Sequence, residues 1–187
     1  MNRVIISIAM ICFVLSTACT NTAGKTPIEK RQAIIDMRNQ VLSDLYKIKP
    51  DVIAQINSAE GYAVFSNANI NLVFASFGGG HGVVRDNRSG TNTFMKMGEA
   101  GVGLGIGAKD FRLVFVFHSR DALTQFVDTG WAFGVNADAA AKASEKGGAV
   151  GGEATFDNIT VYQLTESGLA LQATIKGTKF WRDTELN

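Results

Sequence analysis

Glycine alternates with aliphatic residues from Gly101 to Gly107, and this alternation constrains the fold more than any other feature of the chain. In a strand, successive side chains point to opposite faces of the sheet. Val102, Leu104 and Ile106 would therefore lie on one face and leave bare backbone on the other. A bare face permits strong bending or a close approach by another element. The alternation predicts a single strand over these residues, in a strongly curved sheet.

A second glycine run, Gly78-Gly79-Gly80-His81-Gly82, predicts a tight turn or a β-bulge. It also resembles the segment that forms the oxyanion hole of some esterases. Such enzymes carry their nucleophile in a Gly-x-Ser-x-Gly pentapeptide, and the sequence contains none. A hydrolase with His81 as its base is therefore the least favoured function. The glycines to which we assign a structural role are Gly78, Gly79, Gly80, Gly82, Gly101, Gly103, Gly105 and Gly107.

Several other segments have the alternation or the apolar content of strands. The run Phe111–Phe117 is apolar except for Arg112, which predicts a central strand buried on both faces, and Asp110 is interpreted as the turn before it. Two alternating segments around Glu166-Ser167-Gly168 predict a hairpin. Residues 131–146 fit a helix and a strand equally well. The remaining predicted strands are Tyr62–Phe65, Leu72–Phe77, and the two hairpin arms, Ile159–Leu164 and Leu169–Ile175.

Two helices are indicated by their boundary residues. Thr26, Pro27 and Glu29 form a start signal, and apolar residues then recur at helical spacing over 27–48, until Pro50 ends or bends the helix. One or two further turns are expected over 51–57. The apolar stripe is interpreted as packing on the domain core, and a membrane-facing amphipathic surface is the alternative. A second helix is predicted from Ser119 to Asp128, closed by Gly130.

These elements predict an α+β fold, in which an N-terminal helix and a central helix pack on a curved antiparallel sheet or partial barrel. The predicted domain covers residues 26–187.

The first 18 residues have the three parts of an export signal. Arg3 is followed by an apolar run that is too short to span a bilayer, and small residues then lead to Cys19. This pattern predicts a lipoprotein signal over 1–18, acylation of Cys19 and a tether over 19–25. Simple secretion into the periplasm is the alternative. Because Thr20 rather than aspartate follows Cys19, we expect attachment to the periplasmic face of the outer membrane.

Composition excludes several functions. After removal of 1–18 and its one charge, Arg3, 17 of the 18 basic residues remain against 17 acidic ones, so no basic field would attract nucleic acid. The histidines, His81 and His118, have no cysteine or carboxylate at the spacing of metal ligands. We therefore expect no metal, no cofactor and no catalytic residues.

One segment mixes basic and aromatic residues in a way that suits a lipid headgroup interface. It lies near the carboxyl terminus, and basic residues of the first helix could add to it. The candidate lipid-binding residues are Lys30, Arg31, Arg38, Lys176, Lys179, Trp181 and Arg182.

The motifs at 61–65, 77–83 and 98–107, with Tyr162, Ser167-Gly168-Leu169 and Gly177, resemble the SYLF domain family, over about residues 26–182. The resemblance implies a lipid-binding, non-enzymatic domain of mixed α and β structure. Some family members bind actin, which we do not expect of a bacterial envelope protein. The predicted function is a non-catalytic envelope lipoprotein whose partners are membrane phospholipids. A scaffold or adaptor that binds another envelope protein through the glycine-floored sheet is the alternative.

Overall fold

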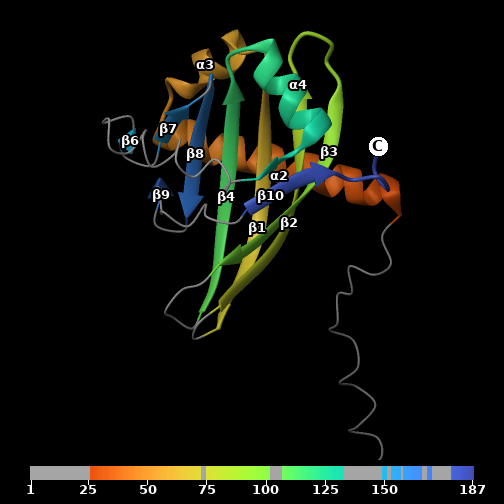
Figure 1. Ribbon diagram of the computed structural model, residues 1–187. Helices are drawn as coiled ribbons and strands as arrows, with labels where there is room; N and C mark the ends of the chain where they lie inside the picture. The colour runs from red at the N-terminus through yellow and green to blue at the C-terminus, as the bar shows by residue number, and fades with distance from the viewer. Residues whose placement is uncertain are drawn as a thin grey trace, which may run out of the picture.

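The computed structural model describes residues 26–72, 75–101, 107–132, 149–150, 153–156, 158–165, 168–169 and 178–187. Helices α2 (Pro27–Ile48) and α3 (Val52–Ser58) come first, and α4 (Arg120–Thr129) follows the first four strands. The strands form one antiparallel sheet, with α2 and α4 on opposite faces (Figure 1). This architecture confirms the predicted α+β class with a curved sheet.

The sheet is built around a long central meander. Its order is β5-β10-β3-β2-β1-β4-β8-β7-β6, and β9 pairs with β8. The strands are β1 (Gly61–Leu72), β2 (Ala75–Asp86), β3 (Asn92–Gly101), β4 (Gly107–Phe117), β5 (Trp131–Ala132), β6 (Ala149–Val150), β7 (Glu153–Phe156), β8 (Ile159–Thr165), β9 (Gly168–Leu169) and β10 (Thr178–Arg182).

Helix α2 begins where the sequence predicts. The Glu29 amide donates to the Thr26 hydroxyl at 3.3 Å, and the Thr26 amide donates to the Glu29 carboxylate at 2.7 Å, which completes a capping box. Ile34, Val41 and Leu45 are buried against the sheet. The apolar stripe of α2 therefore belongs to the core, as interpreted from the sequence.

The two faces of the sheet carry different cores. On the α2 and α3 face, Val64, Val114 and Tyr162 pack with side chains of the two helices. On the α4 face, rings gather around Phe126, which lies 5.4 Å from Phe115 between centroids. The five residues Leu113–Phe117 of β4 have no exposed surface, which confirms burial on both faces for this part of the predicted strand, whereas Arg112 is exposed.

Helix α4 and the β8–β9 hairpin also follow their sequence signals. The Ser119 hydroxyl accepts from the Ala122 amide at 3.3 Å, and Gly130 follows the helix with φ at +68°. Thr165 pairs with Gly168 in the hairpin. The second hairpin arm beyond Leu169, and residues 133–146 of the ambiguous segment, lie outside the described residues.

Three strand predictions are wrong. The segment Leu72–Phe77 is not one strand, because Leu72 ends β1 and pairs with Ala75, which begins β2. No Gly, Pro or Asn marks this reversal in the sequence, so an apolar run conceals it. Asp110 does not turn the chain; it lies within β4 and pairs with Ala68.

The third error concerns the glycine alternation. Gly101 ends β3 and Gly107 begins β4, and these strands run in opposite directions on either side of the β1–β2 hairpin. Gly101 and Gly107 therefore belong to two different strands, contrary to the prediction of a single strand. Gly103 and Gly105 lie outside the described residues.

The run Gly78–Gly82 is neither a turn nor a bulge. It lies inside β2, in continuous register with β1 and β3. A Cβ on Gly82 would overlap the Phe65 ring and lie 2.5 Å from the Val64 carbonyl oxygen, whereas a Cβ on Gly79 would meet nothing within 4 Å. The two glycines thus have different roles, one making room for a core ring and the other leaving the surface flat.

The last residues of the chain tie the start of α2 to β3. The Asn187 side chain accepts from the Phe94 amide at 2.9 Å and donates to the Phe94 carbonyl at 2.8 Å. The Arg31 Nε donates to the Leu186 carbonyl at 2.7 Å, and Leu186 is buried beside Ile34. The carboxyl terminus consequently lies next to the beginning of α2 (Figure 1).

An ion pair joins α4 to the β2–β3 turn. Arg120 Nη2 donates to Asp86 Oδ2 at 2.6 Å, and Asp86 Oδ1 accepts from the amides of Arg88 and Ser89 at 2.9 and 3.1 Å. The hydrogen bond from Arg120, helped by the two amides, holds the pKa of Asp86 well below its usual range.

We predict opposite outcomes for two glycine substitutions in β2. Gly82→Ala should lower the free energy of unfolding by at least about 2 kcal/mol, because its methyl group overlaps Phe65 and backbone. Gly79→Ala should leave stability unchanged or raise it by up to about 1 kcal/mol, because its site is open and its φ is not positive. Urea unfolding of both variants tests this, and equal losses would contradict the register of β2.

Asp86→Asn should destabilise the protein at neutral pH, because it removes the charge that Arg120 binds. A carboxyl whose pKa is lowered by folding stabilises the protein above its unfolded pKa of about 4, and this stabilisation fades as pH falls. The stability difference between wild type and variant should therefore shrink between about pH 5 and pH 2. Thermal unfolding across this range measures it, and a constant difference would refute the ionic origin.

Candidate functional site

The pairing register aligns five residues across five neighbouring strands. Trp181 pairs with Lys96, Lys96 with His81, His81 with Ser66, and Ser66 with Arg112. Directly paired residues of antiparallel strands point to the same face of a sheet. We call this set, Trp181, Lys96, His81, Ser66 and Arg112, the cationic row.

The cationic row lies on the face that carries α2. Two residues further along β3, β2, β1 and β4 stand the apolar side chains that pack under the helices: Phe94, Val83, Val64 and Val114. Side chains two apart in a strand share a face, so the row continues this face beyond the helix. His81 and Arg112 are exposed, and Trp181 keeps 40% of its surface exposed. The row is thus accessible to a partner.

Gly98 makes room for the Trp181 ring, and Gly79 leaves the neighbouring sheet surface without a side chain. A Cβ on Gly98 would lie 2.9 Å from the Trp181 indole, so the ring rests over bare backbone. Gly98 pairs with exposed Lys179 on one side and with the open Gly79 on the other. Lys179 therefore stands beside the row on a surface that few side chains obstruct.

The charges of this surface are unequally balanced. Lys96 Nζ lies 3.3 Å from the buried Asp183 carboxylate, so its charge is partly compensated. Hydrogen bonds from Gln40 and Lys47 lower the pKa of Asp44, and the positive charge of Arg112 contributes to the same shift. Lys179 has no ion-pair partner among the residues that the structure describes. Lys179 and Arg112 are the exposed cations best able to meet an external anion.

The candidate lipid-binding residues predicted from the sequence fall in different places. Lys30 lies 3.6 Å from Glu185, and Arg31 is held by the carboxyl-terminal residues. Arg38 bonds the neighbouring Asn39 side chain on α2. In the described part of the chain, none of these three side chains has a hydrogen bond or an ion pair with a residue of the row.

Near the carboxyl terminus, the structure separates the predicted cluster by face. Lys179 and Trp181 share the face of the cationic row, whereas Arg182 pairs in register with Met95 and reaches Asp128 of α4 at 3.5 Å. Lys176 and Cys19 lie outside the described residues. Lys96 and Arg112 were absent from the prediction, because only the strand register shows that Lys96 pairs with Trp181 and that Arg112 lies on the same face at the other end of the row.

Neither histidine belongs to a catalytic arrangement in the described part of the chain. His118 Nε2 lies 2.8 Å from the hydroxyl of Thr160, which is buried, and no carboxylate hydrogen bond to either ring is found there. Since β2 pairs on both sides, the amides of Gly78–Gly80 face neighbouring strands and cannot line an oxyanion hole. No group of three His, Cys, Asp or Glu side chains that could hold a metal occurs among the described residues.

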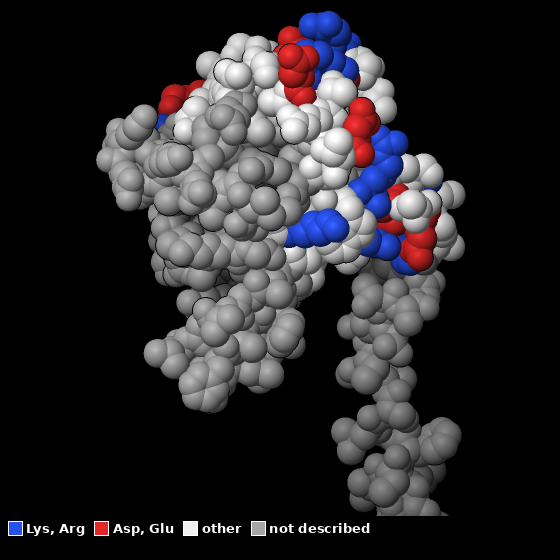
Figure 2. All heavy atoms as spheres, viewed as in Figure 1, with Lys and Arg blue, Asp and Glu red and all other residues white. Residues whose placement is uncertain are grey.

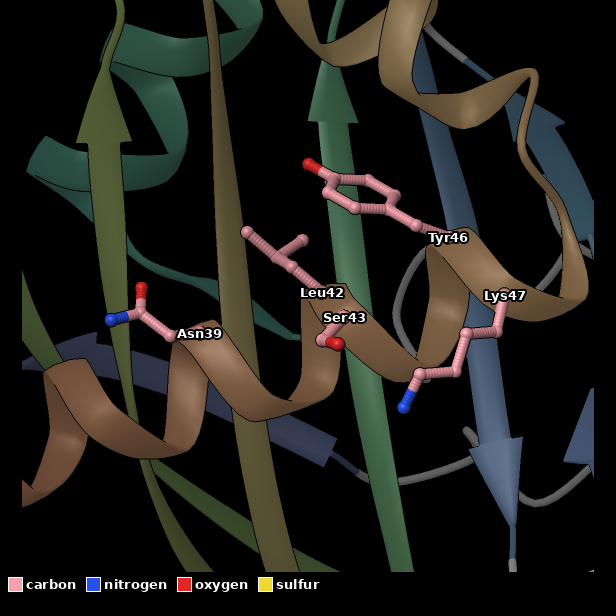
Figure 3. A pocket seen from close by; sticks show the side chains of 5 residues that line it. All are labelled: Asn39, Leu42, Ser43, Tyr46 and Lys47. Carbon is pink, nitrogen blue, oxygen red and sulfur yellow. The ribbon is translucent and has the colours of Figure 1, made fainter.

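An open hollow of about 470 Å³ runs beside α2 (Figure 3). Leu42 and Tyr46 extend from one side of the helix and Lys47 from the other. Burial raises the pKa of the Tyr46 phenol. Among described residues the hollow is lined only by α2, through Asn39, Leu42, Ser43, Tyr46 and Lys47, so no set of groups from several elements converges on it.

On the face drawn in Figure 2, most lysine and arginine side chains lie next to aspartate or glutamate side chains. The described part of that face has no broad patch of one sign. Within the described residues, no helix combines the length and the apolar content needed to cross a bilayer.

The fold and the site define a class of protein: an α+β binding domain that presents an open sheet surface. Residues 98–187 match the Ysc84 family, described as "Las17-binding protein actin regulator". The chain is also 33% identical over 169 residues to Beta cell expansion factor A of Aeromonas veronii. That alignment covers 87% of this chain, and the chain spans 60% of the length of that relative.

The carboxyl-terminal part of the chain is thus similar to the Ysc84 family, whose domain is the SYLF domain that the sequence motifs resemble. This similarity supports a general role in binding lipids or proteins.

Proposed function

We propose that this protein is a non-catalytic envelope lipoprotein that binds phospholipid headgroups through the cationic row and Lys179. Its anchor is an acylated Cys19 in the periplasmic face of the outer membrane. The observation that carries the proposal is the register, which brings Trp181, Lys96 and Arg112 onto one exposed face from three separate strands.

The chemistry of these side chains suits a bilayer surface. Tryptophan favours the boundary between headgroups and hydrocarbon, because its ring is apolar and its N–H is polar. Basic side chains near an anionic surface contribute about 1 kcal/mol each. Trp181 and Lys179 are two residues apart in β10 and both are exposed, so one face of the strand presents a ring and a cation together.

The proposed anchor would keep this surface near the membrane. Cys19 precedes Thr26, the cap of α2, by seven residues, which can span at most about 25 Å. Helix α2 lies on the same face of the sheet as the cationic row. A short tether at the start of α2 is therefore compatible with contact between the row and the bilayer.

The family description names a protein-binding role in actin regulation. We do not extend actin binding to this chain, since we propose that it works in a bacterial envelope. Protein binding in general is the second candidate. The specific observation that favours it is the flat floor of Gly98 and Gly79, on which another envelope protein could pack closely.

Vesicle flotation of the Cys19→Ala chain tests lipid binding without the anchor. We expect it to float with vesicles of phosphatidylethanolamine and phosphatidylglycerol and far less with phosphatidylcholine alone. The double variant Lys179→Ala, Arg112→Ala should bind about 30-fold more weakly, at about 1 kcal/mol per lost charge.

The matched control is Arg88→Ala, Arg182→Ala, which removes the same charge outside the row. It should bind like the parent chain. Equal losses in both doubles would show attraction by net charge alone, and no flotation of the parent would favour the protein-binding candidate.

A separate experiment tests the anchor. Mass spectrometry of the protein extracted from cell membranes should give an amino-terminal residue that carries the mass of a diacylglyceryl group on Cys19. The hydrocarbon chains should keep it in the membrane fraction, because each buried CH₂ contributes about 0.8 kcal/mol. Cys19→Ser should move the protein to the soluble periplasmic fraction. An unmodified thiol in the wild-type protein would disprove acylation.

A further inference from the structure

The central strands of the sheet continue beyond the cationic row to an end that none of the three described helices covers. β1 runs on from Ser66 to Leu72, which pairs with the first residue of β2. In Figure 1 this end of the sheet extends well beyond α2, and α3 and α4 lie toward the opposite end. We call it the distal end, and it consists of residues 67–72 of β1, 75–80 of β2, 97–101 of β3 and 107–111 of β4.

The sequence of β1 gives the distal end two faces of different chemistry. Apolar residues alternate there with asparagines, Ala68, Ile70 and Leu72 with Asn67, Asn69 and Asn71. Residues two apart in a strand share a face of the sheet. Because Ser66 belongs to the cationic row, the apolar set occupies the face of the row, and the asparagines occupy the opposite face.

Strand pairing extends both faces to the neighbouring strands, since directly paired residues share a face. On the face of the cationic row, the register places Ile70, Leu72, Ala75, Phe77, Ala100 and Ala108. On the opposite face, it places Asn69, Asn71, Ser76, Glu99 and Lys109. The distal end is therefore an amphipathic sheet, with an apolar face that continues the face of the row.

The chemistry of this face changes in order along the strands. Between the row and the apolar positions lie Gly98, Gly79 and Ala68, with Lys179 on one side and Asp110 on the other. The order is thus a level of cations, a level of small residues with a charge on each side, and then apolar levels. A bilayer changes in the same order, from phosphates through the headgroup boundary to hydrocarbon.

The length of the strands fits this order of layers. Ser66 and Ile70 are four residues apart in β1, which corresponds to about 14 Å along a strand. The headgroup layer on each side of a bilayer is only about 5–8 Å thick. A strand whose cationic row lies at the phosphates would consequently reach the hydrocarbon at Ile70, even when the sheet is strongly tilted.

The backbone of the distal end can also tolerate an apolar environment. As far as Ile70 and Phe77, β1 and β2 are each paired with a neighbouring strand on both sides. Their N–H and C=O groups are bonded within the sheet and do not need water. The polar residues of the opposite face do need water, so the sheet would lie in the interface and not span the bilayer.

We propose that the apolar face of the distal end enters the hydrocarbon boundary of an anionic bilayer while the cationic row holds the phosphates. This inference rests on the proposed headgroup binding. The exposed cations Lys179 and Arg112, at the border of the apolar face, favour an anionic bilayer over a second protein as its occupant. Trp181, which is 40% exposed, would lie at the headgroup boundary.

Polar substitution on either face tests the proposal by flotation with vesicles of phosphatidylethanolamine and phosphatidylglycerol. In the Cys19→Ala chain, Ile70→Ser should weaken binding at least about tenfold, or about 1.4 kcal/mol, because one apolar side chain no longer leaves water. Asn69→Ser is the matched control, since it changes the neighbouring residue on the opposite face. It should bind like the parent chain, and equal binding by both variants or equal losses in both would overturn the proposal.

A fluorescent label measures insertion directly and does not depend on the stability of Ile70→Ser. The sequence holds two cysteines, so Cys12→Ala and Cys19→Ala give a chain to which one labelled cysteine can be added. With the same vesicles, a label at Ile70→Cys should lose fluorescence to nitroxide groups on the acyl chains. A label at Asn69→Cys should keep its fluorescence.

The outcomes separate this inference from the headgroup binding on which it rests. A parent chain that floats while the label at position 70 stays unquenched overturns insertion and leaves headgroup binding in place. A parent that does not float overturns both. Quenching of both labels overturns the assignment of faces, and energy transfer between labelled copies without vesicles would show that a second copy, and not a bilayer, covers the apolar face.

Discussion

Burial of β4 on both faces is the constraint on which the rest of the structure depends. Its Leu113, Phe115 and Phe117 enter the core under α4, while Val114 and Val116 enter the core under α2 and α3. A slip of one residue would exchange these two sets and open both cores. Packing thus fixes which side chains of β4 face each core. Because the strands pair in continuous register, it also fixes which residues of β1, β2, β3 and β10 lie beside one another. The members of the cationic row share one face of the sheet only because the strands pair in this register.

Much of the fold could be predicted because local signals agree with the tertiary structure. The Thr26 capping box, the Ser119 cap and Gly130 mark helix ends by hydrogen bonding or backbone conformation that needs no distant partner. The apolar run of β4 needs only burial. The failures at Leu72–Phe77 and at the glycine alternation have a common cause. In both segments the strand pattern of the composition continues from the end of one strand to the beginning of the next, so no local residue signal marks the boundary.

The candidate site was less predictable than the fold. Lys179 and Trp181 were predicted together because they are close in sequence. For the same reason Arg182 was included in the predicted cluster, although the alternation of side chains in β10 places it on the other face. Lys96 and Arg112 are isolated in the sequence and carry no motif. Their association with Trp181 arises from pairings between strands that are far apart along the chain. The register of β10 against β3 would have been needed to find Lys96, and the registers of β3, β2, β1 and β4 would have been needed to find Arg112.

The bond between Arg31 and the Leu186 carbonyl joins residues 155 positions apart. Contacts of such separation form only when both ends of the domain are available, and they slow folding relative to local contacts. During synthesis, α2 would be made first, but its contacts with Leu186 could form only after residue 186 had been made. A growing chain would therefore remain incompletely closed for most of its synthesis, a condition compatible with passage through a membrane channel as an extended polypeptide.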